Sequence, residues 1–139
     1  MRFQGSVERD DAFWLAAVPV FDAMTQGRTR HEALEMMTDW FVTMLGRPRA
    51  VVRIHTTGRA AFEVAADDTR SMVSLLLRRQ RQKSGLSLAQ AADRLGARSR
   101  NAYARYEQGG CVPTMEKLDA LLRDIAPGQD IVLSQSDAA

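Results

Sequence analysis

The spacing of apolar and polar positions changes along the chain, and the first part alternates with the period of a β-strand. Residues 3–8 alternate, and a second apolar run covers residues 12–18, which is typical of two antiparallel strands. Residues 9–11 are expected to form the turn between them. Pro19 ends the second strand because it has no amide hydrogen to donate. Residues 20–24 are expected to form a short third strand.

Helical spacing begins at residue 30, after the capping pattern Thr29-x-x-Glu32. This pattern predicts a helix over about residues 30–45 that ends at Gly46. Its apolar face comprises Ala33, Leu34, Met37, Trp40, Phe41, Met44 and Leu45. Two more strand-like runs follow, over residues 50–56 and 60–66. We expect a small antiparallel sheet with one packed helix.

The remaining segment is helical throughout by its spacing and contains four predicted helices. The first covers Met72 to Lys83, and the last covers Met115 to Ile125. Between them lie two short helices, one opened by the capping box Ser87-x-x-Gln90 and one by Ser99. A glycine follows each short helix, as is common where a helix ends. This arrangement predicts a helix-turn-helix, an α+β fold overall, and two domains, 1–67 and 68–139 with a short C-terminal tail.

The second short helix presents side chains that suit the edges of DNA bases. Tyr103 and Tyr106, three residues apart, are expected to pack inward. The outward row would then comprise Arg100, Asn101, Ala104, Arg105 and Gln108. Arginine can bind guanine through two hydrogen bonds and asparagine can bind adenine in the same way. We therefore expect this helix to read DNA in the major groove.

Charge separates this reading from an ordinary antiparallel helix pair with a solvated face. Residues 70–110 carry nine Arg and Lys against two Asp and Glu, although the whole chain has a net charge of only +2. Residues 1–67 carry eight Arg against nine acidic side chains. A basic second half and a nearly neutral first half indicate two modules with different partners.

The composition disfavours a disulfide-bonded protein and a membrane protein. The single cysteine, Cys111, has no internal partner, which fits a reducing compartment, and we expect it to fill a small buried space. The seven methionines follow helix faces and are expected in the core. No apolar run approaches the roughly 18 residues of a membrane span. A soluble, cytoplasmic protein without membrane contact is expected.

Neither catalysis nor a cofactor is expected. His31 and His55 have no partner at metal-ligand spacing, so no metal site is predicted. The carboxylates of the first half are not brought together by any pattern; they are Glu8, Asp10, Asp11, Asp22, Glu35 and Glu63. A metal-dependent nuclease stays open only as a remote alternative.

Motifs in both halves resemble the HicB antitoxin of HicA/HicB toxin–antitoxin systems. In the first half these are Phe13-Trp-Leu-Ala-Ala-Val-Pro19, Met24-Thr-Gln-Gly27 and Glu32-Ala-Leu34. In the second half, the segment from Ser99 to Gly109, followed by Val112-Pro113 and Glu116-Lys-Leu118, is similar to the phage-repressor-like (Cro/CI) domain of HicB proteins. The resemblance covers about residues 3–125.

The resemblance implies a partial ribonuclease-H-like first domain that sequesters a HicA-like toxin, which is an mRNA interferase. It also implies that the second domain binds operator DNA and represses the operon of the pair. The expected DNA-binding residues are Ser99, Arg100, Asn101, Arg105, Arg98 and Gln90. Acidic side chains steer basic partners, so Glu8, Asp10 and Asp11, together with Trp14, are expected to contact the toxin.

Two further expectations follow from size and from the alternatives. Modules of this size commonly gain stability by oligomerisation, and a palindromic operator is read by paired recognition helices. We expect a homodimer or a larger even assembly. The alternative function is a stand-alone helix-turn-helix regulator whose N-terminal domain senses a ligand.

Overall fold

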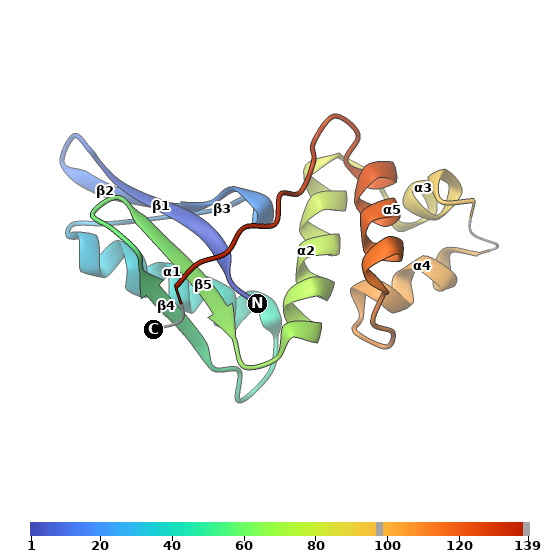
Figure 1. The fold of residues 1–139 in the computed structure, drawn as a ribbon, viewed down its shortest axis with the longest axis horizontal. Helices are drawn as coiled ribbons and strands as arrows, with labels where there is room; N and C mark the ends of the chain where they lie inside the picture. Colours follow the sequence, from blue (N-terminus) through green and yellow to red (C-terminus); the bar gives the residue numbers. More distant parts are fainter. Residues whose placement is uncertain (97–98, 138–139) are drawn as a thin grey trace.

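The computed structural model describes residues 1–96 and 99–137 and, within these ranges, contains one β-sheet and five α-helices (Figure 1). The strands are β1 (Phe3–Asp10), β2 (Phe13–Val18), β3 (Ala23–Gly27), β4 (Val52–Thr56) and β5 (Ala61–Ala66), and a 3-10 turn, η1 (Pro19–Phe21), precedes β3. The helices are α1 (Arg30–Leu45), α2 (Thr69–Lys83), α3 (Leu88–Arg94), α4 (Arg100–Glu107) and α5 (Met115–Ile125). The predicted α+β class is confirmed.

The sheet has the strand order β3-β2-β1-β5-β4, and every pairing is antiparallel. Helix α1 packs on one face. The side chain of Thr25 marks that face, because its hydroxyl donates to the carbonyl of Ala33 in α1 at 2.9 Å. Val7 and Ala16, which lie in register with Thr25 across β1 and β2, are buried beneath α1.

The hairpin between β1 and β2 is tighter than the sequence predicts. Asp10 pairs with Phe13, so the loop contains only Asp11 and Ala12, and Arg9 stays in the strand. Asp11 adopts a φ of 51°, in the left-handed region that aspartate tolerates better than most residues. The expectation of a turn at residues 9–11 is therefore wrong by about two positions.

The predicted third strand exists but begins three residues later than expected from residues 20–24, because Pro19 starts a 3-10 turn. Asp22, with a φ of 50°, reverses the chain, and β3 begins at Ala23. The fully buried ring of Phe21 explains the turn. Its centroid lies 4.8 Å from that of Phe3 and 5.1 Å from that of Phe41, both in edge-to-face geometry. A strand through this segment would take the ring out of that contact.

Helix α2 packs between the sheet and the last helices. It contacts η1, β5 and α1 on one side and α4 and α5 on the other. Accordingly Met72, Leu75, Leu76 and Leu77 are all buried, although they do not share one helix face. Both halves of the chain contribute to one continuous cluster of buried side chains.

Some expectations about side-chain burial are wrong. Cys111 is exposed, because it lies in the loop that connects α4 to α5. Of the seven methionines, only Met37 and Met72 are buried; Met1, Met24, Met36 and Met115 are exposed. Within the described residues, no helix is long and apolar enough to cross a membrane.

Candidate nucleic-acid interface

Helices α3 and α4 form the predicted helix-turn-helix, and each has the expected start. In α3, the Ser87 hydroxyl accepts from the amide of Gln90 at 3.1 Å, and the Gln90 side chain accepts from the amide of Ser87 at 2.8 Å. Ser99 caps α4 by accepting from the amide of Ala102 at 3.4 Å. Gly96, with a φ of 60°, ends α3 in the left-handed conformation that favours glycine.

One stripe of α4 faces solvent. Asn101, Arg105 and Gln108 are exposed, and their spacing of four and three residues places them on one side of the helix. Arg100 is also exposed, at the first turn. Ala104, predicted to face outward, is buried, because it lies with Tyr103 on the side of α4 that packs against the rest of the domain. Tyr103 is buried as predicted.

A buried ion pair holds the end of α4 to α2. The Arg81 guanidinium donates to both carboxylate oxygens of Glu107, Nε at 2.6 Å and Nη2 at 3.1 Å. Its Nη1 donates to the carbonyl of Leu86 at 2.7 Å, which ties the loop before α3 to the same side chain. The hydrogen bonds with Glu107 raise the pKa of Arg81 above its ordinary value. One arginine therefore fixes both helices of the motif.

The sequence gives no local sign of this pair, since its members are 26 residues apart. Within residues 70–110, Arg81 is one of nine basic side chains and Glu107 is one of two acidic ones. The Tyr103 hydroxyl is buried nearby and makes no hydrogen bond with any described residue. Burial raises the pKa of Tyr103, and the neighbouring Glu107 carboxylate raises it further.

Other arginines that the sequence suggested for DNA are used inside the fold. Arg70 donates to the carbonyl of Gly109 at 3.3 Å, and Arg94 to that of Asp124 at 3.4 Å. Arg78 donates to the carbonyl of Met44 at 2.7 Å. These side chains still contribute positive potential, but they are committed to holding helix and loop ends.

Arg79 joins the helical part to the α/β part. It donates to the carbonyls of Phe21 and Asp22 at 2.8 and 2.9 Å. Its guanidinium also lies 5.4 Å from the centre of the Trp40 ring, within the range of a cation–π contact. Among the basic residues between 70 and 110 that the structure describes, Lys83, Arg100 and Arg105 make no side-chain hydrogen bond or ion pair with the described chain.

The structure therefore brings together four of the six expected DNA-binding residues. Ser99, Arg100, Asn101 and Arg105 lie at the start and along the exposed side of α4. Gln90 is exposed on α3, and its carbonyl oxygen is used in the capping box, which leaves its amide NH₂ group to donate. Arg98 lies outside the described residues.

The residues expected to contact a toxin lie around the β1–β2 hairpin, but not on one face. Glu8 and Asp10 share a face of the sheet with Phe13, which pairs with Asp10. Asp11 is in the loop, and all four are exposed. Trp14 pairs with Arg9, so it points to the opposite face and is half-buried. Figure 1 shows this hairpin at the end of the molecule opposite α3 and α4.

The remaining candidate residues are scattered. Glu63 is buried on the sheet and pairs with Arg2 at 3.3 Å. Exposed His31 lies 3.2 Å from Glu35 along α1. Within the described part of the chain, no three side chains of His, Cys, Asp or Glu are grouped as metal ligands would be.

Comparison with known proteins agrees with the geometry of the helical part. Residues 73–123 match the family model described as a helix-turn-helix domain. Neither the curated proteins nor the solved structures contain a match to the chain. The matched range begins within α2 and ends within α5, so it contains the Arg81–Glu107 pair and all of α4. This similarity supports a DNA-binding helix-turn-helix in the second half of the protein.

Proposed function

We propose that the protein is a transcription regulator that binds operator DNA with α4 in the major groove. The observation that carries the proposal is the exposed side of α4, where Asn101 and Arg105 are one helical turn apart. Both side chains can make paired hydrogen bonds to a purine edge. The buried Arg81–Glu107 pair holds this helix in place, as a recognition helix needs a fixed orientation.

The test uses DNA from upstream of the protein's own gene and random DNA of equal length. Arg105→Ala should weaken operator binding by roughly 1–3 kcal/mol and relax specificity at one base position. Arg123→Ala is the matched control, because Arg123 is an exposed arginine on α5 that pairs with Asp119. Fluorescence anisotropy at several salt concentrations gives both affinities. An equal loss on random DNA would assign Arg105 to phosphate alone.

For the α/β part, we propose the antitoxin role that the HicB resemblance implies, with a HicA-like ribonuclease as the partner. The support is the exposed acidic group of Glu8, Asp10 and Asp11, beside the exposed ring of Phe13. Acidic side chains favour encounter with a basic RNA-binding protein. The hairpin lies far from α4 (Figure 1), so one molecule has room for both partners.

Purification of the tagged protein from its own cells, with intact-mass analysis, tests the antitoxin role. A single small basic chain in fixed stoichiometry is expected. Replacing Glu8, Asp10 and Asp11 with Lys should slow association and reduce its salt dependence. Operator binding without any co-purified protein would favour the stand-alone regulator instead.

We further propose that operator binding requires a homodimer or a larger even assembly. Two copies of α4 about 34–36 Å apart would reach successive major grooves of a palindromic site. Light scattering at micromolar concentration measures the assembly, and a monomer that binds one half-site would contradict the proposal.

A further inference from the structure

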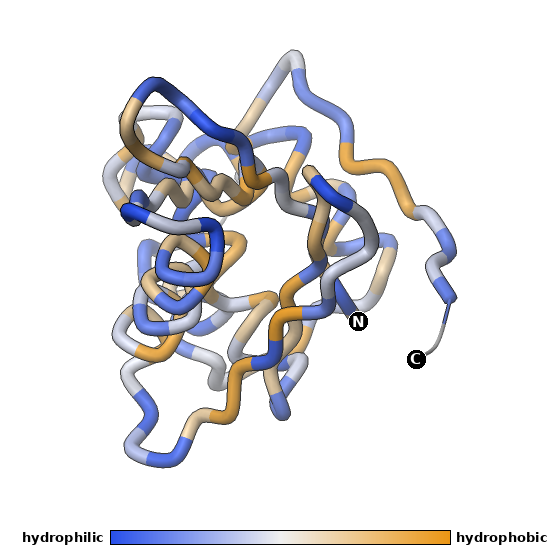
Figure 2. Tube along the Cα trace, turned by 90° about the vertical axis from the view of Figure 1, so that its left-hand side faces the viewer, coloured by the Kyte–Doolittle hydropathy of each residue, from blue (hydrophilic) through white to orange (hydrophobic). Residues whose placement is uncertain are grey.

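The C-terminal segment, residues 130–137, crosses from the helical part to the sheet. It follows α5 and runs beside β1, where the Gln4 side-chain amide donates to the Ser134 hydroxyl oxygen at 3.1 Å. Arg2 donates to the carbonyl of Asp137 at 3.2 Å. Figure 2 shows an apolar stretch in this segment on the outside of the fold. It corresponds to Ile131, Val132 and Leu133, which are all exposed.

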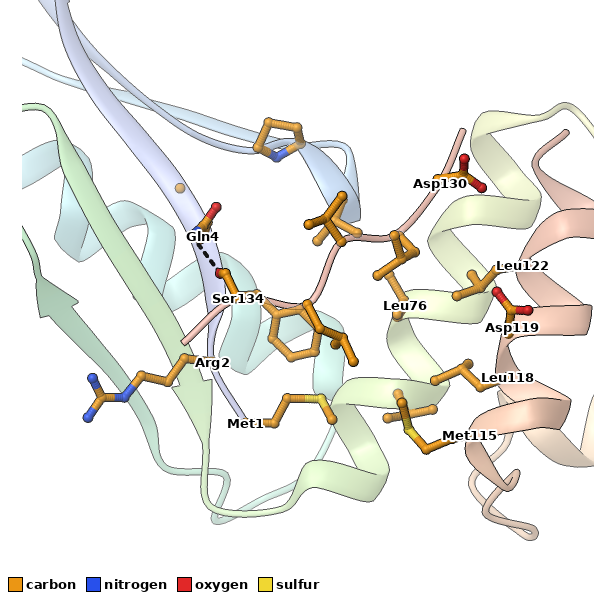
Figure 3. Close-up of a pocket in the computed structure, with 18 of the residues that line it drawn as sticks. Met1, Arg2, Gln4, Leu76, Met115, Leu118, Asp119, Leu122, Asp130 and Ser134 are labelled. Atoms are coloured by element: carbon orange, nitrogen blue, oxygen red, sulfur yellow. Dashed lines mark hydrogen bonds between the residues drawn. The ribbon is translucent and has the colours of Figure 1, made fainter. Parts of the chain in front are cut away.

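Beneath this segment lies a partly open cavity of about 840 Å³. Its walls come from β1, α2, α5 and the C-terminal segment, as Figure 3 shows. The wall is mainly apolar and includes Val20, Leu76, Met115, Leu118, Leu122 and Val132. A cavity of this size between two parts of a fold, apolar with a few polar groups, has the character of a small-molecule site.

The charged groups around the cavity disfavour an anionic ligand. Arg2 is paired with Glu63 at 3.3 Å, and Asp119 with Arg123 at 3.1 Å. Asp130 also lines the cavity and forms no ion pair with the described residues, so a cationic ligand would have a partner there. An anionic ligand would lose hydration without gaining a free cationic side chain. The Gln4–Ser134 bond uses the serine oxygen as acceptor, so the serine hydroxyl can still donate. An uncharged oxygen of the ligand can accept from it.

We propose that this cavity binds an apolar small molecule that has a hydrogen-bonding oxygen and no negative charge, and that the C-terminal segment forms the outer wall of the site. The occupant is a small molecule because the cavity has the volume of one and combines an apolar wall with a few polar groups. Helix α2 also packs against α4, and α5 packs against α3. A bound molecule would therefore contact the two helices that support the helix-turn-helix.

Isothermal titration calorimetry of the full chain with straight-chain alcohols tests the site without DNA. Binding should reach one molecule per chain, and affinity should rise about threefold to fourfold for each added methylene from hexanol to decanol. Decanoate, which is negatively charged at neutral pH, should bind at least about tenfold more weakly than decanol. Absence of saturable decanol binding would overturn the proposal, whatever the outcome of the DNA experiments.

Met115→Glu places a charge in the wall and should weaken decanol binding by about tenfold or more. Met115 is 58% exposed, so the substitution should not unfold the protein. Met36→Glu is the matched control, because Met36 is 46% exposed on α1 and does not line the cavity. Equal effects of the two variants would show non-specific binding and overturn the proposal.

Val132→Asp distinguishes an outer wall from a segment that fills the cavity itself. Val132 is 82% exposed, and its replacement should weaken decanol binding if the segment is the wall. Tighter binding by Val132→Asp would mean that the segment competes with the ligand. If a second copy of the chain occupied the cavity instead, the unmodified protein would not bind decanol, and Met115→Glu would lower the mass of the assembly. Either result would overturn the proposal.

Discussion

At the scale of single residues, Glu107 is the acidic side chain that holds α4 to α2 in the helix-turn-helix part. Its side chain is 6% exposed and accepts two hydrogen bonds from Arg81. A buried pair of this kind adds little compared with apolar residues, but removal of one partner leaves the other charge buried without compensation. Helix α4 is thus held in place by a contact that its exposed polar side chains do not make.

Glu107→Ala should lower the free energy of unfolding by about 3–5 kcal/mol, because Arg81 would remain buried and unpaired. Urea unfolding followed by circular dichroism measures the change. The control is Asp119→Ala, which removes an exposed ion pair with Arg123 and should cost less than about 1 kcal/mol. A similarly small loss for Glu107→Ala would show that water reaches Arg81.

At the scale of elements, the start of α2 is set by Asp68. Its carboxylate accepts from the Ser71 hydroxyl at 2.6 Å and from the amide of Arg70 at 3.0 Å. The hydrogen bond from Ser71 is the main reason that the pKa of Asp68 lies below its ordinary value, and Arg47 lowers it further. Helix α2 supports both the sheet and α4, so this cap affects the whole fold.

Asp68→Ala should lower the free energy of unfolding at neutral pH by about 1 kcal/mol, because the cap is lost. The folded-state pKa of Asp68 is depressed, so its stabilisation is present above the ordinary value of 3.8 and is lost as pH falls through the folded value. Asp68→Asn keeps a capping oxygen and should retain most of the neutral-pH stability while weakening this acid dependence. Thermal unfolding between pH 3 and pH 7 measures both effects.

Strand β3 and helix α1 approach each other closely at Gly27. A methyl group there would collide with the backbone nitrogen of Ala33. Gly27→Ala should therefore destabilise the protein by about 1–3 kcal/mol through overpacking. Gly58→Ala is the control, since its nearest neighbour would be the Ala61 methyl at 4.0 Å. Comparison of their urea midpoints tests the close approach, and equal midpoints would contradict it.

At the scale of the whole molecule, α2 joins the sheet and the helices into one continuous buried cluster. Arg79 adds contacts to Phe21, Asp22 and Trp40 across the same junction. Loss of either part would expose apolar side chains of α2. The two parts should consequently unfold together.

A single unfolding transition is therefore expected in urea. Tryptophan fluorescence reports the α/β part, because both tryptophans, Trp14 and Trp40, lie there. Far-ultraviolet circular dichroism reports helix content, and four of the five described helices, α2 to α5, lie in the second part. The two curves should coincide, as in two-state unfolding. Separate midpoints would mean that the junction is too weak to couple the parts.

The sequence by itself determined most of the elements, including the two short helices of the helix-turn-helix, because these depend on neighbours within a few residues. Capping at Thr29, Ser87 and Ser99 and the glycine at Gly96 are local interactions, and each is found where the pattern places it. Where burial overrides local preference the prediction was wrong: η1 forms because the ring of Phe21 enters the core.

Only the tertiary structure decided which charges are free and which surfaces are covered. The arginines of residues 70–110 are equivalent in sequence, yet Arg79 and Arg81 bind partners 57 and 26 residues away, whereas Arg105 faces solvent. The cavity beneath residues 130–137 likewise joins segments from both ends of the chain. Such contacts depend on how the elements pack in space, and no spacing along the chain encodes them.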